Sequence, residues 1–344
     1  KTTTTSLIGH VLSQLGLKVA VAGNIGNPIS CFAGKDLDYI VVELSSFQLY
    51  WTNLLKPDLA VITNLAPDHI DWHGNYSNYI SAKSRICQLR KRGSWVIIQE
   101  RDIPLLQIEN MEKVMPLRWS SNCLSRYVSE ITMDLTKNEA KMQIEGFSRK
   151  LISFEEVSLI GDHNLENVAM ALASVNLTGL KIKDPASIMK KFTPPPHRCE
   201  LVGEVDGVSY VDDSKGTNVA ASKSALSSIK GKKVVILGGR GKGEDYGPLA
   251  EEVKQSSQVA ILLGEESDSI AKSLENCGFS SYYRVSNMEE AVLLASRIAD
   301  PGMTVLLSPA CTSWDMYSSY KKRGEHFQKL VKELPGVVKD NSAE

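Results

Sequence analysis

The chain has 344 residues, which is long for a single domain and sufficient for two. Apolar residues make up 42% of it and charged residues 23%, and the formal net charge is −1. This is the composition of an ordinary globular protein without a broad basic surface, so we expect no nucleic-acid partner.

No apolar run approaches the roughly 20 residues that a membrane-spanning helix needs, so we expect no membrane partner either. The six cysteines are scattered and include no CxxC pair, which predicts reduced thiols in a cytosol-like compartment rather than disulfides or a zinc site. They are Cys31, Cys87, Cys123, Cys199, Cys277 and Cys311.

The first predicted element is a helix over residues 3–15, in the opening stretch KTTTTSLIGHVLSQLG. Its apolar residues recur at helical spacing, and Gly16 supplies the stop. A lysine followed by threonine at a helix start is how the phosphate-binding pattern G-x-x-x-x-G-K-[ST] ends. Lys1 and Thr2 match only these last two positions, and the alternative is a frayed, threonine-rich helix start.

Short apolar runs follow and predict parallel strands that are covered on both faces: LKVAVAG, LDYIVVELS, DLAVITNL and SWVIIQ. Alternating patterns between residues 105 and 160 predict a small antiparallel annex, and a helix follows from about Asn164. Three prolines in KKFTPPPHRCE mark a domain boundary. Behind them we predict a second α/β unit, with a closing helix from about Tyr317 and the strands VSYVDD, KKVVILGG, QVAILLG, YYRVS and MTVLLSPA.

Polar side chains follow apolar strands of the first unit, at the edge where an open α/β sheet binds ligands. Glu43 ends the run VVEL and is suited to holding Mg²⁺, although a solvent-facing acid is the alternative. Asp68 and His69 come just past the strand that ends at Asn64. His73 lies at a metal-compatible spacing from His69, but the turn residues between them favour a structural role for it.

Three further positions of the chain have a simple structural interpretation. Lys83 lies on a predicted amphipathic helix, where a solvated surface lysine is expected. Asn164 and Asn167 flank a helix start, where N-capping is expected. Cys311 in SPACTS is interpreted as a buried thiol rather than a nucleophile, because no histidine is placed in sequence to act as its base.

Two cations open the second unit. Arg198 follows the prolines and Lys215 lies in the turn DDSKG, and together they are suited to clamping phosphate or carboxylate. The stretch VVILGGRGKGEDYG carries Lys242 and looks like a dinucleotide-binding loop. Its third required glycine is replaced by Glu244, so we do not expect NAD binding.

Taken in order, these motifs resemble the Mur ligase family: a P-loop lysine, GNIG, ELSSFQ, N-x-x-x-DH, AK-x-R, HN-x-x-N, PHR, DDSK-x-TN, GG-x-x-K and SPAC-x-S. The resemblance covers nearly the whole chain apart from residues 100–150, and ELSSFQL and LLSPACTSWD are its specific parts. It implies an α/β fold in two domains. Residues 1–192 would form a central P-loop ATPase-type domain with a mostly parallel sheet, and residues 193–344 a Rossmann-like α/β C-terminal domain that binds the amino acid.

The implied activity is ATP-driven amide bond formation in the synthesis of the peptidoglycan precursor. ATP would phosphorylate the carboxylate of UDP-N-acetylmuramoyl-L-alanine, D-glutamate would attack the acyl phosphate, and phosphate would leave. Such chemistry depends mainly on positioning and on neutralising phosphate charge. The implied cofactors are ATP and two Mg²⁺ ions, together with a carbamylated lysine at Lys83.

The resemblance also implies residue roles. Catalytic roles would fall to Lys1, Glu43, His69, Lys83, Arg198 and Lys215. The metal ions would be held by Thr2, Glu43, His69 and the carbamate on Lys83. ATP would be contacted by Lys1, Thr2, Thr3, Asn164, Asn167, Arg198 and Asp213. The other substrates would be contacted by Asn24, Ser45, Lys215, Thr217, Lys242, Ser313 and Tyr320. Tyr320 stands where the family usually has phenylalanine and Trp314 where it has an aliphatic residue, so we expect a glutamate pocket of different shape.

Family members carry an N-terminal domain that grips uridine diphosphate, followed by a strand and a complete P-loop. These are missing from the sequence, so we expect a weakened fold and little or no activity for residues 1–344 alone. The alternatives are another Mur-type or folate polyglutamate ligase, or a non-catalytic nucleotide-binding homologue. We expect a cytoplasmic monomer, with a plastid stroma as the alternative location for a eukaryotic source.

Overall fold

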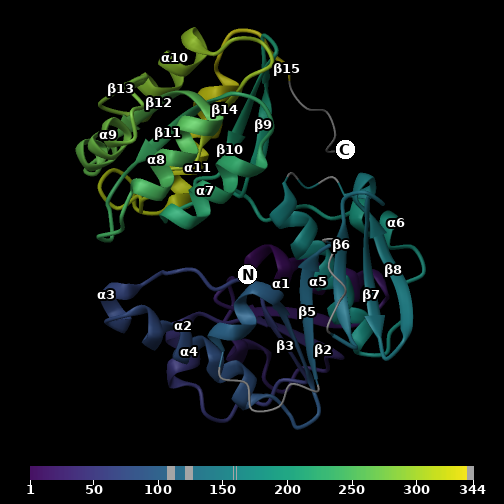
Figure 1. Cartoon of the computed structure of the whole chain (residues 1–344). Coiled ribbons are helices and arrows are strands. Elements are labelled where there is room, and N and C mark those ends of the chain that lie inside the picture. The colour runs from purple at the N-terminus through teal and green to yellow at the C-terminus, as the bar shows by residue number, and fades with distance from the viewer. Residues whose placement is uncertain (107–112, 121–126, 158, 160, 339–344) are drawn as a thin grey trace. The chain divides into compact units, whose positions relative to one another are not determined.

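The computed structural model describes residues 1–106, 113–120, 127–157, 159 and 161–338 (Figure 1). The chain divides into two compact units within its proline run, unit 1 over Lys1–Pro195 and unit 2 over Pro196–Glu344. The five described cysteines are free thiols, as predicted, and Cys123 lies outside the described residues.

Unit 1 begins with the predicted helix and continues as alternating strands and helices. Its helices are α1 (Thr2–Gln14), α2 (Ser46–Trp51), α3 (Ile70–His73), α4 (Tyr76–Leu89), α5 (Asp162–Leu177) and α6 (Pro185–Lys190). Its strands are β1 (Val19–Gly23), β2 (Tyr39–Glu43), β3 (Leu59–Ile62), β4 (Trp95–Gln99), β5 (Val114–Trp119), β6 (Glu130–Asp134), β7 (Glu139–Ile144) and β8 (Phe147–Ser153). Short 3₁₀ helices are η1 (Ile29–Phe32), η2 (Glu100–Leu105) and η3 (Phe154–Glu156).

The strands of unit 1 form two separate sheets. β1 and β2 pair in parallel, and β3 to β8 form a six-stranded sheet in chain order. In the larger sheet β3 to β6 are parallel and β6 to β8 antiparallel. The antiparallel annex is therefore confirmed, although it continues the parallel strands. The prediction that the early strands are covered on both faces is wrong for β2, because Ile40 is 42% exposed.

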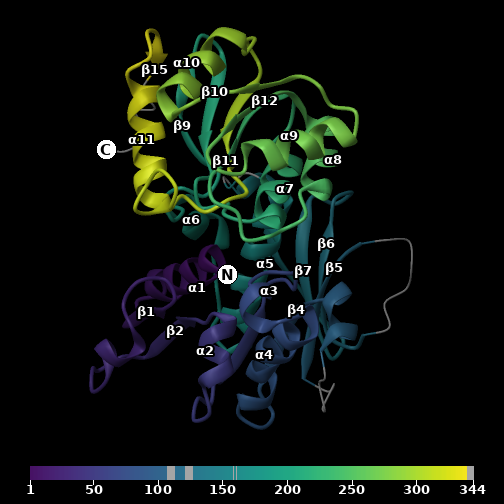
Figure 2. The same ribbon diagram turned by 90° about the vertical axis from the view of Figure 1, so that its left-hand side faces the viewer.

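The core of unit 1 follows from the pattern of its helices. Leu7, Val11 and Leu12 lie on one face of α1 and are buried, and α5 is apolar over most of its length. The two helices pack side by side (Figures 1 and 2). Both contribute to one apolar core with the larger sheet, and this packing fixes the start of α1 beside the start of α5.

Unit 2 is a seven-stranded sheet of order β13-β12-β11-β14-β10-β9-β15, parallel from β13 to β10 and antiparallel at β9 and β15. The strands are β9 (Glu200–Val205), β10 (Val208–Asp212), β11 (Lys233–Gly238), β12 (Ser257–Leu263), β13 (Tyr282–Arg284), β14 (Thr304–Leu307) and β15 (Val337–Val338). The helices are α7 (Val219–Ser228), α8 (Gly247–Ser256), α9 (Ser267–Asn276), α10 (Met288–Ile298) and α11 (Tyr320–Lys332).

Strand β11 shows why this sheet forms the centre of unit 2. Val235 and Leu237 pack into the core beneath α7, α8 and α9, whereas Val234 and Ile236 pack into the core beneath α10 and α11. A strand covered on both faces is apolar throughout, which is the pattern of the predicted strand KKVVILGG. The predicted start of the closing helix is wrong: α11 begins at Tyr320, because Ser319 caps it by accepting a hydrogen bond from the Lys322 N–H.

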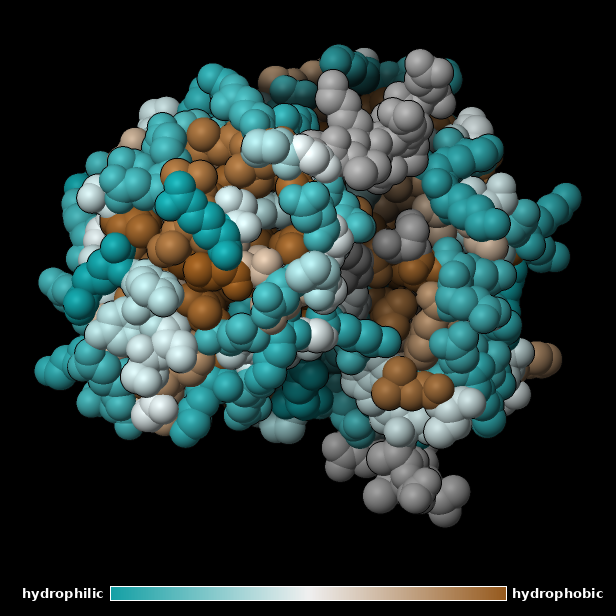
Figure 3. Space-filling view, turned by 90° about the horizontal axis from the view of Figure 1, so that it is seen from above, coloured by the Kyte–Doolittle hydropathy of each residue, from teal (hydrophilic) through white to brown (hydrophobic). Residues whose placement is uncertain are grey.

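Among the described residues no helix is both long and apolar enough to cross a membrane. In the face shown in Figure 3, hydrophilic side chains are interspersed with apolar ones. The large apolar side chains with more than half of their surface exposed include Trp51, Leu54, Phe147 and Trp314.

Candidate active site

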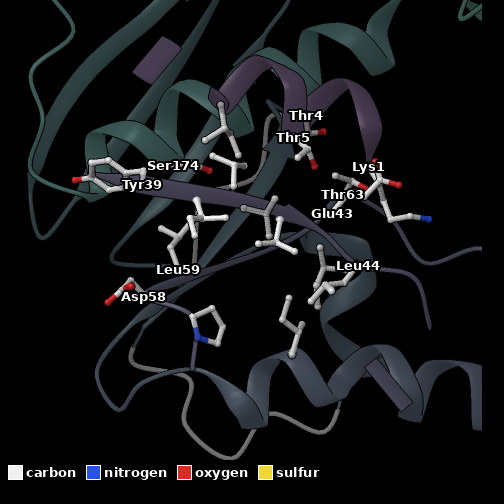
Figure 4. A pocket seen from close by; sticks show the side chains of 18 of the residues that line it. Lys1, Thr4, Thr5, Tyr39, Glu43, Leu44, Asp58, Leu59, Thr63 and Ser174 are labelled. Atoms are coloured by element: carbon white, nitrogen blue, oxygen red, sulfur yellow. The ribbon is translucent and has the colours of Figure 1, made fainter. Parts of the chain in front are cut away.

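A cavity of about 490 Å³ lies between β2 and β3 of unit 1 (Figure 4). Its walls come from these two strands and from α1, α4 and α5. In the described part of the sheets β2 pairs only with β1, and β3 pairs only with β4, so each strand turns an unpaired edge toward this space. Most of the lining is apolar, but Lys1, Glu43, Thr63, Asn64 and Lys83 line it as well. Three of the four candidate catalytic residues of unit 1, Lys1, Glu43 and Lys83, therefore line one cavity at the ends of β2 and β3, whereas His69 is not part of its lining.

Glu43 is buried at the end of β2, with 3% of its surface exposed. Its Oε1 accepts a hydrogen bond of 3.0 Å from the Asn24 side chain, while Oε2 is buried with no hydrogen-bond partner among the described residues. Gly23 allows the close approach, because a Cβ there would lie 2.2 Å from the Glu43 carbonyl oxygen. A buried carboxylate oxygen without a partner is unusual and suits a hard cation such as Mg²⁺. The alternative of a solvent-facing acid is wrong.

Lys83 is also buried, so its interpretation as a solvated surface lysine is wrong. Its Nζ donates a hydrogen bond of 3.2 Å to the Asn64 carbonyl and lies 4.9 Å from the centre of the Tyr79 ring. Burial, together with the charge of Lys1, lowers the pKa of Lys83 to about 7. Asp68 and Asp102 oppose the shift. A fraction of Lys83 is therefore a neutral amine near neutral pH.

His69 and His73 have different surroundings. His69 has a left-handed backbone with φ of 53°, and its Nε2 lies 3.5 Å from Asp68 Oδ2. His73 is buried, its Nε2 lies 3.0 Å from Ser46 Oγ, and its ring stacks on Phe47. Burial lowers the pKa of His73. This packing agrees with the structural role expected for His73 and leaves His69 as the metal-ligand candidate.

The start of α1 is linked to the start of α5. Thr4 Oγ1 donates a hydrogen bond of 2.8 Å to Asn167 Oδ1, and Asn167 Nδ2 donates one of 3.1 Å to Asn164 Oδ1. The N-capping interpretation of the two asparagines is wrong, because Gly161 is the N-cap residue of α5 and no side chain caps it. Thr2 and Thr3 are buried beside Thr4.

Two further carboxylates, the buried Asp102 and the half-buried Glu166, hold this region together, although no local sequence pattern marks them. Asp102 follows β4 and its Oδ2 accepts a hydrogen bond of 2.9 Å from the Leu65 N–H, so it holds the segment that leads to His69. Burial raises the pKa of Asp102. Glu166 on α5 accepts hydrogen bonds of 2.8 Å from both Gln99 and Trp119, which ties the start of α5 to the larger sheet.

The two residues predicted to contact the sugar-nucleotide substrate form hydrogen bonds with nearby residues of unit 1. Asn24 donates to Glu43, as described above, and Ser45 is the N-cap residue of α2. The Ser45 hydroxyl accepts a hydrogen bond from the Gln48 N–H, and the Gln48 side chain returns one to the Ser45 N–H. Their roles in substrate binding stay predictions.

In unit 2 the segment that carries Arg198 is held by its neighbour His197. His197 Nδ1 lies 2.7 Å from Asp212 Oδ2, which raises the pKa of the imidazole and favours its charged form. The His197 N–H donates to Glu200, and its carbonyl accepts from the Lys215 N–H. Arg198 and Lys215 are thus fixed to one another through the backbone of His197.

Gly324 and Asp213 complete this packing. A Cβ on Gly324 would lie 2.2 Å from His197 Nδ1, so only glycine fits there. Asp213 is buried, and its carboxylate accepts hydrogen bonds from the Ser308 hydroxyl at 2.7 Å and the Cys199 N–H at 3.3 Å. Burial raises the pKa of Asp213 to about 7. The role of Asp213 in contacting ATP stays a prediction.

The structure brings some of the predicted amino-acid contacts together. Lys215 Nζ lies 5.2 Å from the centre of the Tyr320 ring. Ser313 is buried at the start of the turn before α11, and its carbonyl accepts the Tyr317 N–H at 2.7 Å. Thr217 and Lys242 are half-buried, Thr217 just before α7 and Lys242 in the loop between β11 and α8.

Cys311 is buried beside Tyr246, whose hydroxyl lies 3.3 Å from its Sγ. Burial raises the pKa of Cys311 to about 12, and the hydrogen bond from Tyr246 opposes the shift only in part. A protonated, buried thiol is a poor nucleophile, so the interpretation of Cys311 as a buried thiol is confirmed.

Two family models match the chain. The model described as the Mur ligase middle domain matches residues 1–175, and the model described as the Mur ligase, glutamate ligase domain matches residues 197–311.

Curated relatives match nearly the whole chain. A UDP-N-acetylmuramoylalanine--D-glutamate ligase from Natranaerobius thermophilus is 38% identical over 339 residues, which cover 98% of this chain and 72% of that protein. A protein of the same name from Pelotomaculum thermopropionicum is 36% identical over 348 residues, covering 97% of this chain and 73% of that protein.

Solved structures share the fold at low sequence identity. MurF ligase from Thermotoga maritima, in complex with ADP, superposes with a TM-score of 0.68 at 17% identity, covering 97% of this chain and 78% of that one. Mycobacterium tuberculosis folylpolyglutamate synthase, with ADP and AMPPCP, superposes with a TM-score of 0.67 at 14% identity, covering 90% of this chain and 86% of that one. At these identities the likeness shows the fold alone.

Proposed function

The chain belongs to the Mur ligase family, and we propose that it is the member that joins D-glutamate to UDP-N-acetylmuramoyl-L-alanine. The reaction is ATP-dependent amide bond formation in peptidoglycan precursor synthesis. ATP phosphorylates the alanine carboxylate, the amine of D-glutamate attacks the acyl phosphate, and phosphate leaves. The structural observation that carries the proposal is the polar end of the cavity, where Lys1, Glu43 and Lys83 meet.

Each unit supplies different chemistry. In unit 1, Lys1 and the threonines that follow it are suited to phosphate, and Asn164 and Asn167 to the nucleotide. In unit 2, Arg198 and Asp213 are proposed to act on ATP, while Lys215, Thr217, Lys242, Ser313 and Tyr320 receive D-glutamate. The two carboxylates of D-glutamate require cations and hydroxyl groups, which this set provides.

Mur ligases use ATP together with Mg²⁺, and the residues present fit such an ion. The buried Oε2 of Glu43 is an oxygen donor without a partner in the described part of the chain, and Thr2 and His69 are the further candidate ligands. Bound Mg²⁺ supplies positive charge against the phosphate oxygens. We further propose that two Mg²⁺ ions bind and that each of these residues is a ligand of one or both ions.

We also propose that Lys83 is carbamylated. Its neutral amine can attack carbon dioxide, which forms an N–C bond and releases one proton, and the lysine becomes an anionic carbamate. The pKa of about 7 supports this step, because it makes the nucleophilic neutral form accessible near neutral pH. A carbonyl signal that appears in the ¹³C spectrum with labelled bicarbonate, and is lost in Lys83→Ala, is the expected result.

Product detection by mass spectrometry tests the activity, since it registers even slow turnover. Incubation with ATP, Mg²⁺, UDP-N-acetylmuramoyl-L-alanine and D-glutamate should yield the ligated product and ADP, and L-glutamate should not replace D-glutamate. Lys83→Ala should abolish the product, and Lys150→Ala, at a lysine whose side chain is 51% exposed, should not. Ligation of L-glutamate to folate would instead support a polyglutamate ligase. Binding of ATP without any ligated product would support a non-catalytic homologue.

The remaining assignments rest on chemistry alone. Because ATP and UDP-linked sugars are cytoplasmic metabolites, we propose a cytoplasmic location. We also propose that the protein acts as a monomer, which sedimentation at several concentrations would test.

A further inference from the structure

Arg323 in unit 2 is almost completely buried, with 2% of its surface exposed, and it lies in the first turn of α11. Its guanidinium donates four hydrogen bonds to two segments that are distant in sequence. Nε donates to Ser214 Oγ at 3.0 Å and Nη2 to the Ser214 carbonyl at 2.9 Å. Nη2 also donates to the Cys311 carbonyl at 3.0 Å, and Nη1 to the Thr312 carbonyl at 3.3 Å.

All four acceptor groups are neutral, and this sets Arg323 apart from an ordinary ion pair. Burying a cation without a carboxylate partner is costly, and burial lowers the pKa of Arg323 to about 10. The guanidinium nevertheless stays charged near neutral pH. Its planar fork of donors can reach several carbonyl groups at once, which the ammonium of a lysine cannot do.

The two segments that Arg323 joins carry predicted amino-acid contacts. Ser214 directly precedes Lys215, and Thr312 directly precedes Ser313. The Ser214 hydroxyl donates to the Tyr320 carbonyl at 2.8 Å, so the start of α11 is bound into the same network. The segments also contact each other directly, since the Ala310 N–H donates to the Gly216 carbonyl at 2.9 Å.

We propose that Arg323 is a positioning residue that clamps the Ser214–Gly216 and Ala310–Ser313 segments, so that Lys215, Ser313 and Tyr320 are held ready for the amino-acid substrate. The proposal rests on the proposed function for its substrate, and on the hydrogen bonds alone for the clamp. Arg323 acts through the backbone of its neighbours and touches no reacting atom. Sequence motifs did not reveal it, because its acceptors are main-chain and hydroxyl oxygens.

The test compares Arg323→Lys, which keeps the charge but loses the fork, with Arg323→Gln, which loses both. Lys233→Met is the matched control. Lys233 is 1% exposed and donates to the Gly231 and Ser256 carbonyls, but it lies at the opposite end of β11 from the predicted contacts. The measurements are amide hydrogen exchange at Gly216 and Ala310, and the KM values for D-glutamate and ATP in the ligation assay.

We expect both Arg323 variants to speed amide exchange at Gly216 and Ala310 and to raise the KM for D-glutamate by roughly tenfold or more, since the buried carbonyl groups of both segments lose their donors. The KM for ATP should change less than twofold. Lys233→Met should lower the melting temperature without either effect. If Arg323→Gln does not fold, Arg323→Lys decides the matter.

Two outcomes separate the clamp from the substrate assignment. Faster exchange at Gly216 and Ala310 with an unchanged KM for D-glutamate would support the clamp and contradict the amino-acid site of the proposed function. Unchanged exchange in a folded Arg323→Lys would overturn the clamp, whatever the kinetics show.

Discussion

Replacing Lys83 by methionine should change how the stability of unit 1 depends on pH. The pKa of the buried Lys83 is lowered from 10.5 to about 7 in the folded protein. Between these two values the unfolded chain holds the proton and the folded chain does not. The contribution of the Lys83 amine to the free energy of unfolding is therefore absent below pH 7 and rises as the pH increases toward 10.5. Methionine does not titrate, so the variant lacks this rise.

The size of the expected change in stability follows from the pKa shift of Lys83. Each pH unit within the window adds about 1.4 kcal/mol to the free energy of unfolding of the original protein relative to Lys83→Met. Between pH 7.5 and 9.5 the difference between the two proteins should therefore change by about 2–3 kcal/mol in favour of lysine. Carbon dioxide must be excluded, because carbamylation would replace the titrating amine.

Urea unfolding in bicarbonate-free buffers measures this difference. Four of the five tryptophans lie in unit 1, so intrinsic fluorescence follows the unit that contains Lys83. The contributions of all other titrating groups to the free energy of unfolding cancel when the two proteins are compared at the same pH. Lys329→Met, at a lysine whose side chain is 71% exposed, is the control and should show no such change. An identical stability difference at pH 7.5 and 9.5 would refute the reasoning.

Three further substitutions test other parts of the structure. Glu43→Gln keeps an oxygen that accepts the Asn24 hydrogen bond but removes the negative charge. Calorimetry should therefore show Mg²⁺-dependent binding of ADP weakened by roughly tenfold or more. Unchanged affinity would exclude Glu43 as a ligand of the Mg²⁺ ion. Burial raises the pKa of Asp213 to about 7, so the folded state keeps a proton that the unfolded state loses above pH 4. The stability contributed by Asp213 should fall as the pH rises from 4 to 7. Urea titrations of Asp213→Asn should lack this pH dependence, and a retained dependence would contradict the raised pKa of Asp213. Val61→Phe adds apolar volume to the cavity and should raise the free energy of unfolding by about 1 kcal/mol. Val96→Phe, at a fully buried residue of the neighbouring strand, should lower the free energy of unfolding by overpacking. Equal effects of the two substitutions would show that the cavity does not accept a larger side chain.

The sequence was most informative where local patterns have one physical meaning. The spacing of Leu7, Val11 and Leu12 predicted α1, and the apolar run KKVVILGG predicted the strand that the structure shows as β11. Glu43 was expected at the ligand-binding edge of the sheet because it ends an apolar strand. The prediction of its position needed no knowledge of the tertiary structure.

Burial and long-range contacts were beyond the reach of these patterns. An amphipathic helix does not reveal which lysine is covered by other elements, so the burial of Lys83 was missed. Asn164 and Asn167 were interpreted from their own helix, whereas Thr4, the hydrogen-bond partner of Asn167, lies far away in sequence. Arg323 and Asp102 hold main-chain groups, which every residue has, and therefore leave no motif.

The split sheet of unit 1 has a practical consequence for handling the protein. The margins of β2 and β3 that face the cavity pair with no other strand among the described residues, and they lie beside its apolar lining. Such margins attract extended segments of neighbouring molecules, so concentrated samples should precipitate sooner than dilute ones. Charged substitutions along these margins are the direct way to improve the yield of soluble material.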